Sequence, residues 1–376
     1  MAGFDFIVIG AGIAGASIAA ELAGSGKVVL LEMESQPGYH TTGRSAAIFA
    51  PVYGPAPIRA LTRASEAFFH DPPEGFTDRA MFSPRATLLI AREDQRAVLD
   101  TMMVELGDDP TVERLDADQA HQVQPMLRDG YAVGAVFDQK GQDIDVHALH
   151  HGYLGMFRRA GGVLVCKAEV NSLQRHAGVW QVEAGGERYL APVVVNAAGA
   201  WADQIGAKAG AERIGLVPKR RTALMVPAPA GIETGNMPIT VDIDEQFYLK
   251  PDAGRLLISP ANEDPDVPSD VQPDEMDVAI CIDRIEKAFD LDIKRIENKW
   301  AGLRSFVSDG VPVVGLSTQV EGFLWLAGQG GYGIQSAPAT SRLAAAIVLG
   351  AAVPGDIQDQ GLNPDDLQPG REGARG

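Results

Sequence analysis

The most constraining feature of this chain lies at its start, where glycines separate an apolar segment from a predicted helix. In chain order the pattern consists of residues 4–9 (FDFIVI), 10–15 (GAGIAG), 28–31 (VVLL) and Glu32. Gly10 permits a tight turn, Gly12 lets backbone approach a pyrophosphate, and Gly15 lets helix and strand pack closely. The helix would point its free N–H groups at the phosphates. Glu32 is placed to accept from a ribose hydroxyl, which disfavours a 2′-phosphorylated cofactor. The pattern predicts a dinucleotide-binding βαβ unit.

Length and composition indicate an ordinary globular protein with more than one core. The chain has 376 residues, of which 45% are hydrophobic and 22% charged, so two lobes are expected. Its formal net charge of -18 argues against nucleic acid and anionic membrane surfaces as partners.

Neither a metal site nor a membrane span is expected. The two cysteines, Cys166 and Cys281, are far apart and have no metal-ligand spacing, which favours a reducing compartment. The apolar start lacks a basic region and belongs to the glycine motif, so we do not expect a signal peptide. No uncharged, glycine-free stretch is long enough for a membrane helix. We expect a cytoplasmic protein, and peripheral contact with the inner face of a membrane stays open.

A second glycine-rich segment near the other end of the chain favours a flavin. Residues 323–327 (FLWLA) predict a buried strand, and residues 328–335 (GQGGYGIQ) predict a loop that opens a helix. One helix would face the pyrophosphate, and the positive end of the other would stabilise the negative charge of a reduced flavin ring. FAD is therefore favoured over a dissociating NAD.

The order of predicted elements indicates an α/β fold with two interleaved domains. A Rossmann-like FAD-binding domain is predicted from residues 1–85, 140–215 and 300–353. A smaller α+β substrate domain with a mostly antiparallel sheet is predicted from residues 86–139 and 216–299, where strand patterns alternate around one helix. Residues 354–376 are predicted to be a flexible tail.

Several motifs together resemble the D-amino acid oxidase family of flavoproteins, and most closely its bacterial D-arginine dehydrogenase group. They are residues 10–15 with Glu32, 42–47 (TGRSAA), 196–201 (NAAGAW), 300–304 (WAGLR) with 309–310, and 328–335. The resemblance covers nearly all of the chain except the tail. It implies the D-amino acid oxidase-like fold and FAD bound non-covalently, since neither cysteine lies in a matching loop.

The resemblance also assigns residues to the cofactor and to the substrate. For FAD it implies Gly10, Gly12, Ile13, Ala14, Gly15, Glu32, Thr42, Gly43, Arg44, Ser45, Ala46, Ala47, Val170, Ala198, Gly199, Trp201, Arg304, Gly330, Gly331, Tyr332, Gly333, Ile334 and Gln335. For the catalytic site it implies Tyr53, Arg221, Tyr248, Arg304 and Gln335. Arginine suits a substrate carboxylate because its planar fork makes two charge-assisted hydrogen bonds.

The implied reaction is oxidative deamination of a D-amino acid to a 2-oxo acid and ammonia, by hydride transfer from Cα to flavin N5. No general base stands out, and an amine bound in its neutral form needs none, so catalysis would rest on orientation and on stabilising the reduced flavin. Resemblance to a dehydrogenase group favours a quinone or another carrier over oxygen as the electron acceptor.

Two departures from the arginine-selective members change the expected substrate. Those members have a histidine where this chain has Ile48 and a side-chain-binding glutamate where it has Thr87. A guanidinium without a carboxylate partner binds about two powers of ten more weakly. With Phe49 beside Ile48, the predicted pocket favours neutral or hydrophobic D-amino acids over D-arginine.

Other functions share these motifs. A glycine or secondary-amine oxidase and a 2-hydroxy acid dehydrogenase are alternatives on the same fold. A non-catalytic flavin-binding protein is a further alternative, against which Tyr53, Tyr248 and Arg304 argue.

Overall fold

A largely parallel sheet forms from the predicted apolar strands of the dinucleotide unit. The computed structural model describes residues 2–374, and in that range this sheet has the order β10-β3-β2-β14-β22-β21. All neighbouring strands are parallel except β21, which runs antiparallel to β22. The strands are β2 (Phe6–Ile9), β3 (Val28–Leu31), β10 (Val163–Val165), β14 (Val193–Asn196), β21 (Val313–Leu316) and β22 (Phe323–Ala327).

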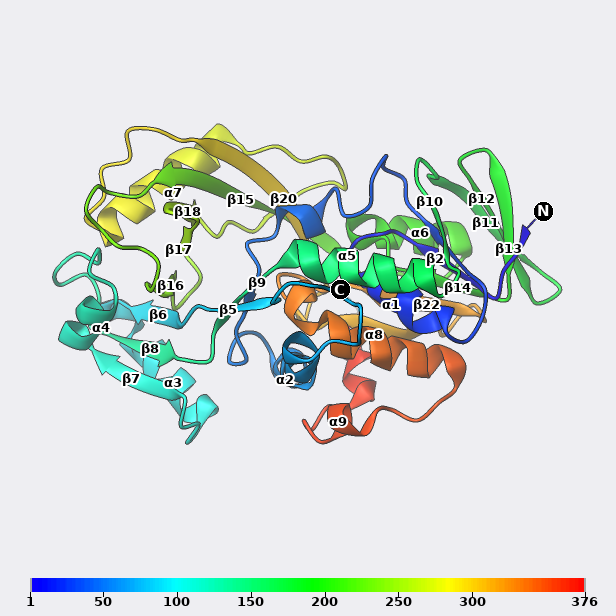
Figure 1. Cartoon of the computed structure of the whole chain (residues 1–376), viewed down its shortest axis with the longest axis horizontal. Helices are drawn as coiled ribbons and strands as arrows, with labels where there is room; N and C mark the ends of the chain where they lie inside the picture. Colours follow the sequence, from blue (N-terminus) through cyan, green and yellow to red (C-terminus); the bar gives the residue numbers. More distant parts are fainter. Residues whose placement is uncertain (1, 375–376) are drawn as a thin grey trace.

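Both faces of this sheet are covered, which explains why its strands are continuously apolar. In β2, Phe6 and Val8 pack towards helices, whereas Ile7 and Ile9 pack into a second apolar cluster on the opposite face. Figure 1 shows α1, α5 and α8 running alongside this sheet. The helices of this lobe are α1 (Ile13–Ala23), α2 (Ala56–His70), α5 (Val146–Arg159), α6 (Ala202–Ala209) and α8 (Gly333–Leu349).

A four-stranded sheet of order β1-β13-β12-β11 closes the other face of the nucleotide-binding lobe. Trp180 of this sheet is 1% exposed and packs with Phe323 of β22. The antiparallel pair of β12 and β13 thus contributes a layer to the core. The strands are β1 (Ala2–Gly3), β11 (Val170–His176), β12 (Val179–Ala184) and β13 (Glu187–Ala191).

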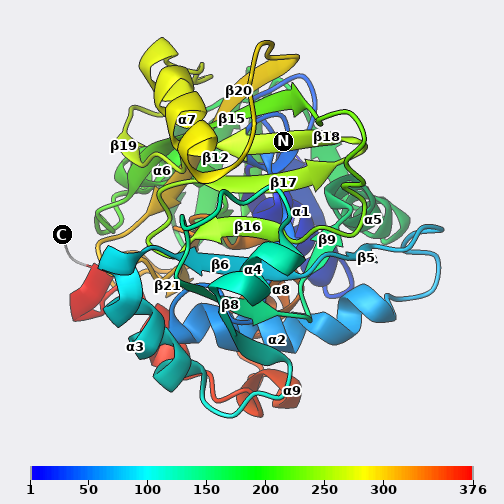
Figure 2. The ribbon, with the colours of Figure 1, turned by 90° about the vertical axis from the view of Figure 1, so that its left-hand side faces the viewer.

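The second lobe is built on a nine-stranded sheet of order β19-β15-β18-β17-β16-β6-β8-β7, with β20 also paired to β15. Its pairs are antiparallel except β16 with β6. Figure 2 shows β15, β18, β17, β16, β6 and β8 following one another across this sheet. The strands are β6 (Thr87–Ala91), β7 (Val112–Asp116), β8 (Gly134–Asp138), β15 (Val217–Pro227), β16 (Ile239–Asp242), β17 (Tyr248–Asp252), β18 (Arg255–Ser259), β19 (Asp264–Pro265) and β20 (Asn298–Phe306).

The two faces of this sheet have different surroundings. Helices α4 and α7 lie over the face turned to the viewer in Figure 2, and Ala120 and Ile285 bury their side chains there. On the other face, Tyr248 and Ala223 pack with Ala46 and Ile48 of the nucleotide-binding lobe. The lobes therefore meet at the face that carries Tyr248. The helices of the second lobe are α3 (Arg96–Leu106), α4 (Ala117–Val123) and α7 (Glu275–Ala288).

A three-stranded sheet of order β4-β9-β5 lies where the chain passes between the lobes. Its strands are β4 (Ile48–Phe49), β5 (Phe82–Pro84) and β9 (Gln142–Ile144). Short 3₁₀ segments are η1 (Thr41–Arg44), η2 (Glu93–Gln95), η3 (Gly199–Trp201), η4 (Pro364–Leu367) and η5 (Glu372–Ala374).

The predicted fold class is confirmed, with two differences in detail. Strand β20 pairs along β15 from Asn298 to Phe306, so its residues join the substrate sheet although residues from 300 onwards were predicted for the nucleotide domain. Residues 354–374 are not a loose tail, because Ile357 of α9 (Gly355–Gln358) and Leu367 of η4 are both 0% exposed and belong to the main apolar cluster.

We predict that Leu367→Ala lowers the free energy of unfolding by about 2–5 kcal/mol, because it removes a fully buried side chain. Leu349→Ala is the control, since Leu349 is 45% exposed and its truncation should change the free energy by less than about 0.5 kcal/mol. Urea unfolding of the holoprotein measures both. Equal midpoints for the two variants would mean that the segment is loosely attached.

Candidate active site

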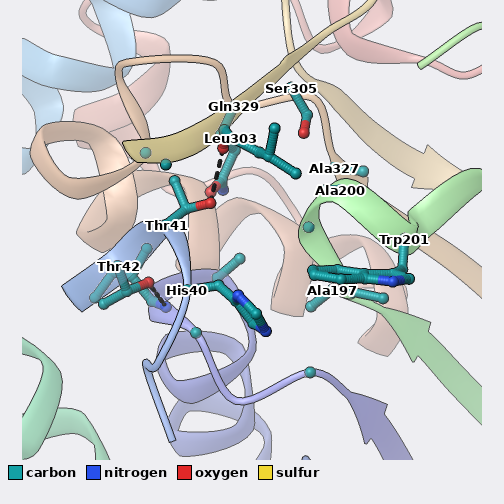
Figure 3. A pocket seen from close by; sticks show the side chains of 18 of the residues that line it. His40, Thr41, Thr42, Ala197, Ala200, Trp201, Leu303, Ser305, Ala327 and Gln329 are labelled. Atoms are coloured by element: carbon teal, nitrogen blue, oxygen red, sulfur yellow. Dashed lines mark hydrogen bonds between the residues drawn. The ribbon is translucent and has the colours of Figure 1, made fainter. Parts of the chain in front are cut away.

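A long cavity runs along the carboxyl ends of the parallel strands and continues to the inner face of the substrate sheet. Figure 3 shows side chains from both lobes around it, including Thr42, Trp201 and Gln329. The predicted residues that line it are Gly10, Gly12, Ile13, Ala14, Glu32, Thr42, Arg44, Ser45, Ala46, Val170, Ala198, Gly199, Trp201, Arg221, Tyr248, Arg304, Gly330, Gly331, Gly333 and Ile334. Cavities at this edge are where doubly wound folds bind dinucleotides.

The first glycine motif forms the turn that its sequence predicts. Gly10 has φ +95°, and a Cβ there would lie 2.5 Å from the Ala197 carbonyl oxygen. A Cβ at Gly15 would lie 1.7 Å from the Gly10 carbonyl oxygen. Gly15 thus sits beneath the cavity wall and lets α1 approach the turn, so that the N-terminus of α1 faces the cavity. The Ile13 N–H there donates to Thr42 Oγ1 at 2.9 Å (Figure 3).

Two side chains fix the Ala11 peptide within this turn. The Ala11 N–H donates to Glu32 Oε2 at 2.8 Å, and the Glu34 N–H donates to Glu32 Oε1 at 2.9 Å. The Ala11 carbonyl accepts from His150 Nε2 at 2.9 Å. Because a carbonyl only accepts, Nε2 carries a proton. Burial lowers the pKa of His150 to about 4, so the ring is neutral at neutral pH.

The loop after β3 is tied to the substrate lobe by three side chains. Thr41 Oγ1 donates to the Leu303 carbonyl at 2.7 Å (Figure 3), and Arg44 Nη1 donates to the Ala301 carbonyl at 2.9 Å. Lys250 Nζ donates to the Ala46 carbonyl at 2.9 Å. This part of the cavity wall is therefore held by both lobes.

The basic end of the cavity combines two arginines and three tyrosines. Strand pairing places Lys219 opposite Arg304 and Arg221 opposite Gly302, so both arginines project from the same face of the sheet. Arg221 is 6% exposed. A Cβ at Gly331 would lie 2.8 Å from Arg304 Nη1, so the second glycine loop packs directly on this guanidinium.

Tyr53 and Tyr332 near these arginines remain protonated at neutral pH. Burial, followed by the nearby Glu245 carboxylate, raises the pKa of Tyr53 well above its ordinary value and that of Tyr332 to about 12. The Tyr53 hydroxyl donates to Glu245 Oε2 at 2.8 Å, and its ring contacts Tyr332 edge to face. These phenols can donate hydrogen bonds, but they cannot act as bases.

A second cavity adjoins this basic end. Tyr53, Arg304 and Tyr332 line it together with acidic side chains, among them Glu245 and Glu263. Tyr53 and Tyr332 thus face the second cavity rather than the long one.

The three residues predicted for the substrate side-chain pocket have different surroundings in the structure. Phe49 is 0% exposed and packs with Phe69 and Phe82 in the core, because neighbouring residues of β4 point to opposite sides. Its prediction as a pocket residue is corrected accordingly. Ile48 packs in the apolar cluster that contains Tyr248. Thr87 is buried in β6, and its Oγ1 has no hydrogen-bond partner among residues 2–374.

The remaining predicted cofactor residues lie behind the cavity wall. Gln335 is 3% exposed and accepts the Ala50 N–H at 3.0 Å, while its Nε2 has no partner in the described part of the chain. A Cβ at Gly43 would lie 2.7 Å from the Gly38 carbonyl oxygen, so Gly43 shapes the loop. Ala47 packs against the main apolar cluster.

Sequence reasoning did not identify His150 or Lys250 as site-supporting residues. His150 is 139 residues from Ala11, and Lys250 is 204 residues from Ala46, so no local pattern connects them. In residues 2–374 there is no group of three His, Cys, Asp or Glu side chains that could hold a metal ion. Across the same residues, no helix has the length and apolarity that crossing a membrane requires.

Comparison with known proteins gives consistent results. The profile of the family described as FAD dependent oxidoreductase (DAO) matches residues 5–347. A glycine oxidase of Bacillus licheniformis is 25% identical over 93% of this chain and 94% of its own length. An L-2-hydroxyglutarate dehydrogenase of Escherichia coli (strain K12) is 27% identical over 56% of this chain and 50% of its own. The structure of glycine oxidase from Geobacillus kaustophilus superposes with TM-score 0.85 at 22% identity, over 99% of this chain and 100% of that one.

We predict that His150→Leu weakens FAD binding about tenfold, because the Ala11 carbonyl loses its buried donor and the turn is less well fixed. His150→Gln, which keeps an N–H donor, should stay within about threefold of the wild type by the same bond energies. Flavin fluorescence quenching on titration of apoprotein measures the dissociation constants. Equal affinities of the two variants would contradict a role of this hydrogen bond.

His150 also predicts a pH dependence of stability. Its pKa is lowered from 6.5 to about 4 in the folded protein, so between these values the unfolded chain binds a proton that the folded chain does not. Stability therefore falls as pH decreases through this window, by up to about 3 kcal/mol from this residue. Unfolding of wild type and His150→Gln at pH 7, 5.5 and 4.5 compares them, and parallel curves would exclude this origin.

Proposed function

Because the chain belongs to the DAO family of FAD dependent oxidoreductases, we propose that it is an FAD-dependent D-amino acid dehydrogenase. Its products would be the 2-oxo acid and ammonia. The cofactor is FAD. The D-arginine dehydrogenase group stays a prediction from sequence motifs, because the full-length relatives that match this chain include enzymes named glycine oxidase.

The observation that carries the proposal is the pair of arginines at the inner end of the cofactor cavity. Arg221, Arg304 and Tyr248 all line this cavity. Two guanidinium groups beside a phenol form a site for a carboxylate, which accepts charge-assisted hydrogen bonds from each. A carboxylate held there would fix the neighbouring Cα next to the cofactor cavity.

The residues of the long cavity fit FAD. Gly10, Gly12 and the N-terminus of α1 suit a pyrophosphate, and Glu32 suits a ribose hydroxyl. Gln329 lines the same cavity, and its Nε2 is a buried donor with no partner in residues 2–374. When bound, FAD supplies the two-electron acceptor for the Cα–H bond.

The chain's own contribution would be orientation and electrostatics. Arg304 and Arg221 would bind the carboxylate, and Tyr248 would donate a hydrogen bond near it, while the Tyr53 hydroxyl is held by Glu245 in the adjoining cavity. Tyr53 and Tyr332 stay protonated because of burial, so neither would accept a proton from the substrate amine. This supports a substrate that binds with its amine already neutral.

The surroundings of Tyr248 favour an uncharged substrate side chain. Its cluster contains Met225, Ile239, Leu257 and the partly buried Ile48, all apolar. Thr87 offers only a hydroxyl. We therefore propose that neutral or hydrophobic D-amino acids are better substrates than D-arginine.

Oxidation of glycine or a secondary amine is the second candidate, because the relative from Bacillus licheniformis is named glycine oxidase and aligns with 93% of this chain. A 2-hydroxy acid is the third, favoured by the similarity to an L-2-hydroxyglutarate dehydrogenase. All three substrate classes carry a carboxylate, so the arginine pair serves each of them.

Anaerobic mixing of the holoprotein with a substrate panel tests these candidates through loss of the flavin absorbance. The panel contains D- and L-amino acids, glycine, sarcosine and L-2-hydroxyglutarate. Reduction by D-leucine, D-methionine or D-phenylalanine with ammonia release supports the proposal. Fastest reduction of the flavin by glycine or sarcosine favours the second candidate. A higher kcat/KM for D-arginine than for the other D-amino acids contradicts the proposed preference for neutral or hydrophobic side chains. Admitting air then shows whether oxygen reoxidises the flavin; we propose that a quinone or another carrier does so faster.

We predict that Arg304→Met raises the dissociation constant of the best amino acid about a hundredfold or more, because one charged partner of the carboxylate is lost. Arg255→Met is the control, since Arg255 lies on β18 with its side chain 45% exposed. Rapid-mixing measurement of flavin reduction against substrate concentration gives the constants. An unchanged constant in Arg304→Met at full flavin content would remove Arg304 from the carboxylate site.

A further inference from the structure

The two arginines of the basic end differ in their internal partners. Arg221 Nη2 donates to Glu263 Oε1 at 3.0 Å, and Lys219 Nζ donates to Glu263 Oε2 at 2.7 Å. Glu263 therefore bridges two cations of β15. In residues 2–374 no carboxylate oxygen forms an ion pair with Arg304, whose neighbours are Tyr53, Tyr248, Glu245 and Tyr332.

The difference in ion pairing between Arg221 and Arg304 matters for a ligand because both side chains lie at the same cavity. Lys219 and Arg304 are directly opposite on β15 and β20, and Arg221 is two residues further along on the same face. Arg221 and Arg304 also line one cavity, whereas Glu263 lines the adjoining one. Arg221 Nε is buried without a partner in the described chain, so Arg221 keeps a free donor while Glu263 holds its Nη2.

Charge balance then distinguishes classes of ligand. Among the ion pairs of residues 2–374, Glu263 is shared by Lys219 and Arg221 and no pair involves Arg304, which leaves the Arg304 charge unpaired. One substrate carboxylate neutralises it. A second substrate carboxylate would meet Arg221, which is already paired with Glu263. It would also be repelled by the nearby carboxylates of Glu263 and Glu245.

We propose that Glu263 is a specificity-determining residue that occupies Arg221 in place of a second substrate carboxylate and so restricts the site to monocarboxylates. This rests on the proposed function in that the arginine pair binds the substrate carboxylate. Glu263 acts through Arg221 and does not touch the reacting atoms.

The test compares a monocarboxylate with a dicarboxylate substrate. For the holoenzyme, Glu263→Gln should raise the ratio of kcat/KM for D-glutamate to that for D-alanine about tenfold or more, which is about 1.4 kcal/mol. The change should appear in KM for D-glutamate rather than in kcat, because Glu263 acts through Arg221 and does not touch the reacting atoms. Glu263→Asp restores a carboxylate and should return the ratio towards that of the wild type.

Asp264→Asn is the matched control, since it removes the same charge from the next residue. Asp264 accepts from Asn262 Nδ2 at 3.1 Å and lies 3.8 Å from Arg220, with its side chain 58% exposed. This variant should leave the ratio within about twofold of the wild type, as expected for a solvent-exposed charge. The proposal is overturned if Glu263→Gln leaves the ratio unchanged, or if Asp264→Asn raises it equally.

Inert ligands separate this proposal from the proposed function. Binding of acetate and of malonate is followed by perturbation of the flavin absorbance, which needs no turnover. Glu263→Gln should tighten malonate binding about tenfold relative to acetate. If no amino acid reduces the wild-type flavin, the proposed function fails while this comparison still decides the role of Glu263. Flavin content and melting temperature verify that each variant is folded.

Discussion

The structure depends on the contact between Gly15 and the Gly10 carbonyl. A single methyl group at residue 15 would lie 1.7 Å from that oxygen, closer than any real contact. Because both residues are glycine, α1 packs onto the turn and its N-terminal N–H groups open into the cavity. Glu32 and His150 then hold the Ala11 peptide from either side. The cofactor end of the site is thus set by backbone geometry, and it is supported by Glu32, directly after β3, and by His150 of α5.

The substrate end depends on contacts between lobes. Strand β20 carries Arg304 into the substrate sheet, while the glycine loop after β22 packs on the same guanidinium through Gly331. Arg44 and Lys250 tie the loop after β3 to β20 and β17. The loop after β3 and the sheet of the second lobe are therefore fixed to each other by hydrogen bonds, so the spacing between the basic end and the other end of the cavity does not rely on either lobe alone.

The sequence predicted those features that depend on residues close together in the chain. Gly10, Gly12, Gly15 and Glu32 form a local pattern with a known backbone purpose, and the structure has them where that pattern requires. Phe49 was misplaced because β4 has only two residues, and the side that each one faces is set by pairing with β9.

Long-range partners lay outside what local patterns can report. His150 and Lys250 form hydrogen bonds to residues more than a hundred positions away, at 139 and 204 residues. Residues 354–374 are polar on average, which hid the few apolar side chains that anchor them. Whether the predicted site residues act as proposed depends on a substrate, which neither pattern nor packing supplies.

The packed C-terminal segment also bears on how molecules of this protein meet one another. Strand β21 ends the parallel sheet, and such an edge offers unpaired backbone groups to a strand of another molecule. A Cβ at Gly315 of β21 would lie 2.4 Å from Gln368 Oε1 and 2.8 Å from Pro369 Cδ, so residues 368–369 pack over this strand. Proline cannot donate to a ladder of strands. The segment thus packs against the end strand of the sheet, and proteolytic loss of it would expose Gly315 and the apolar surface that Leu367 covers.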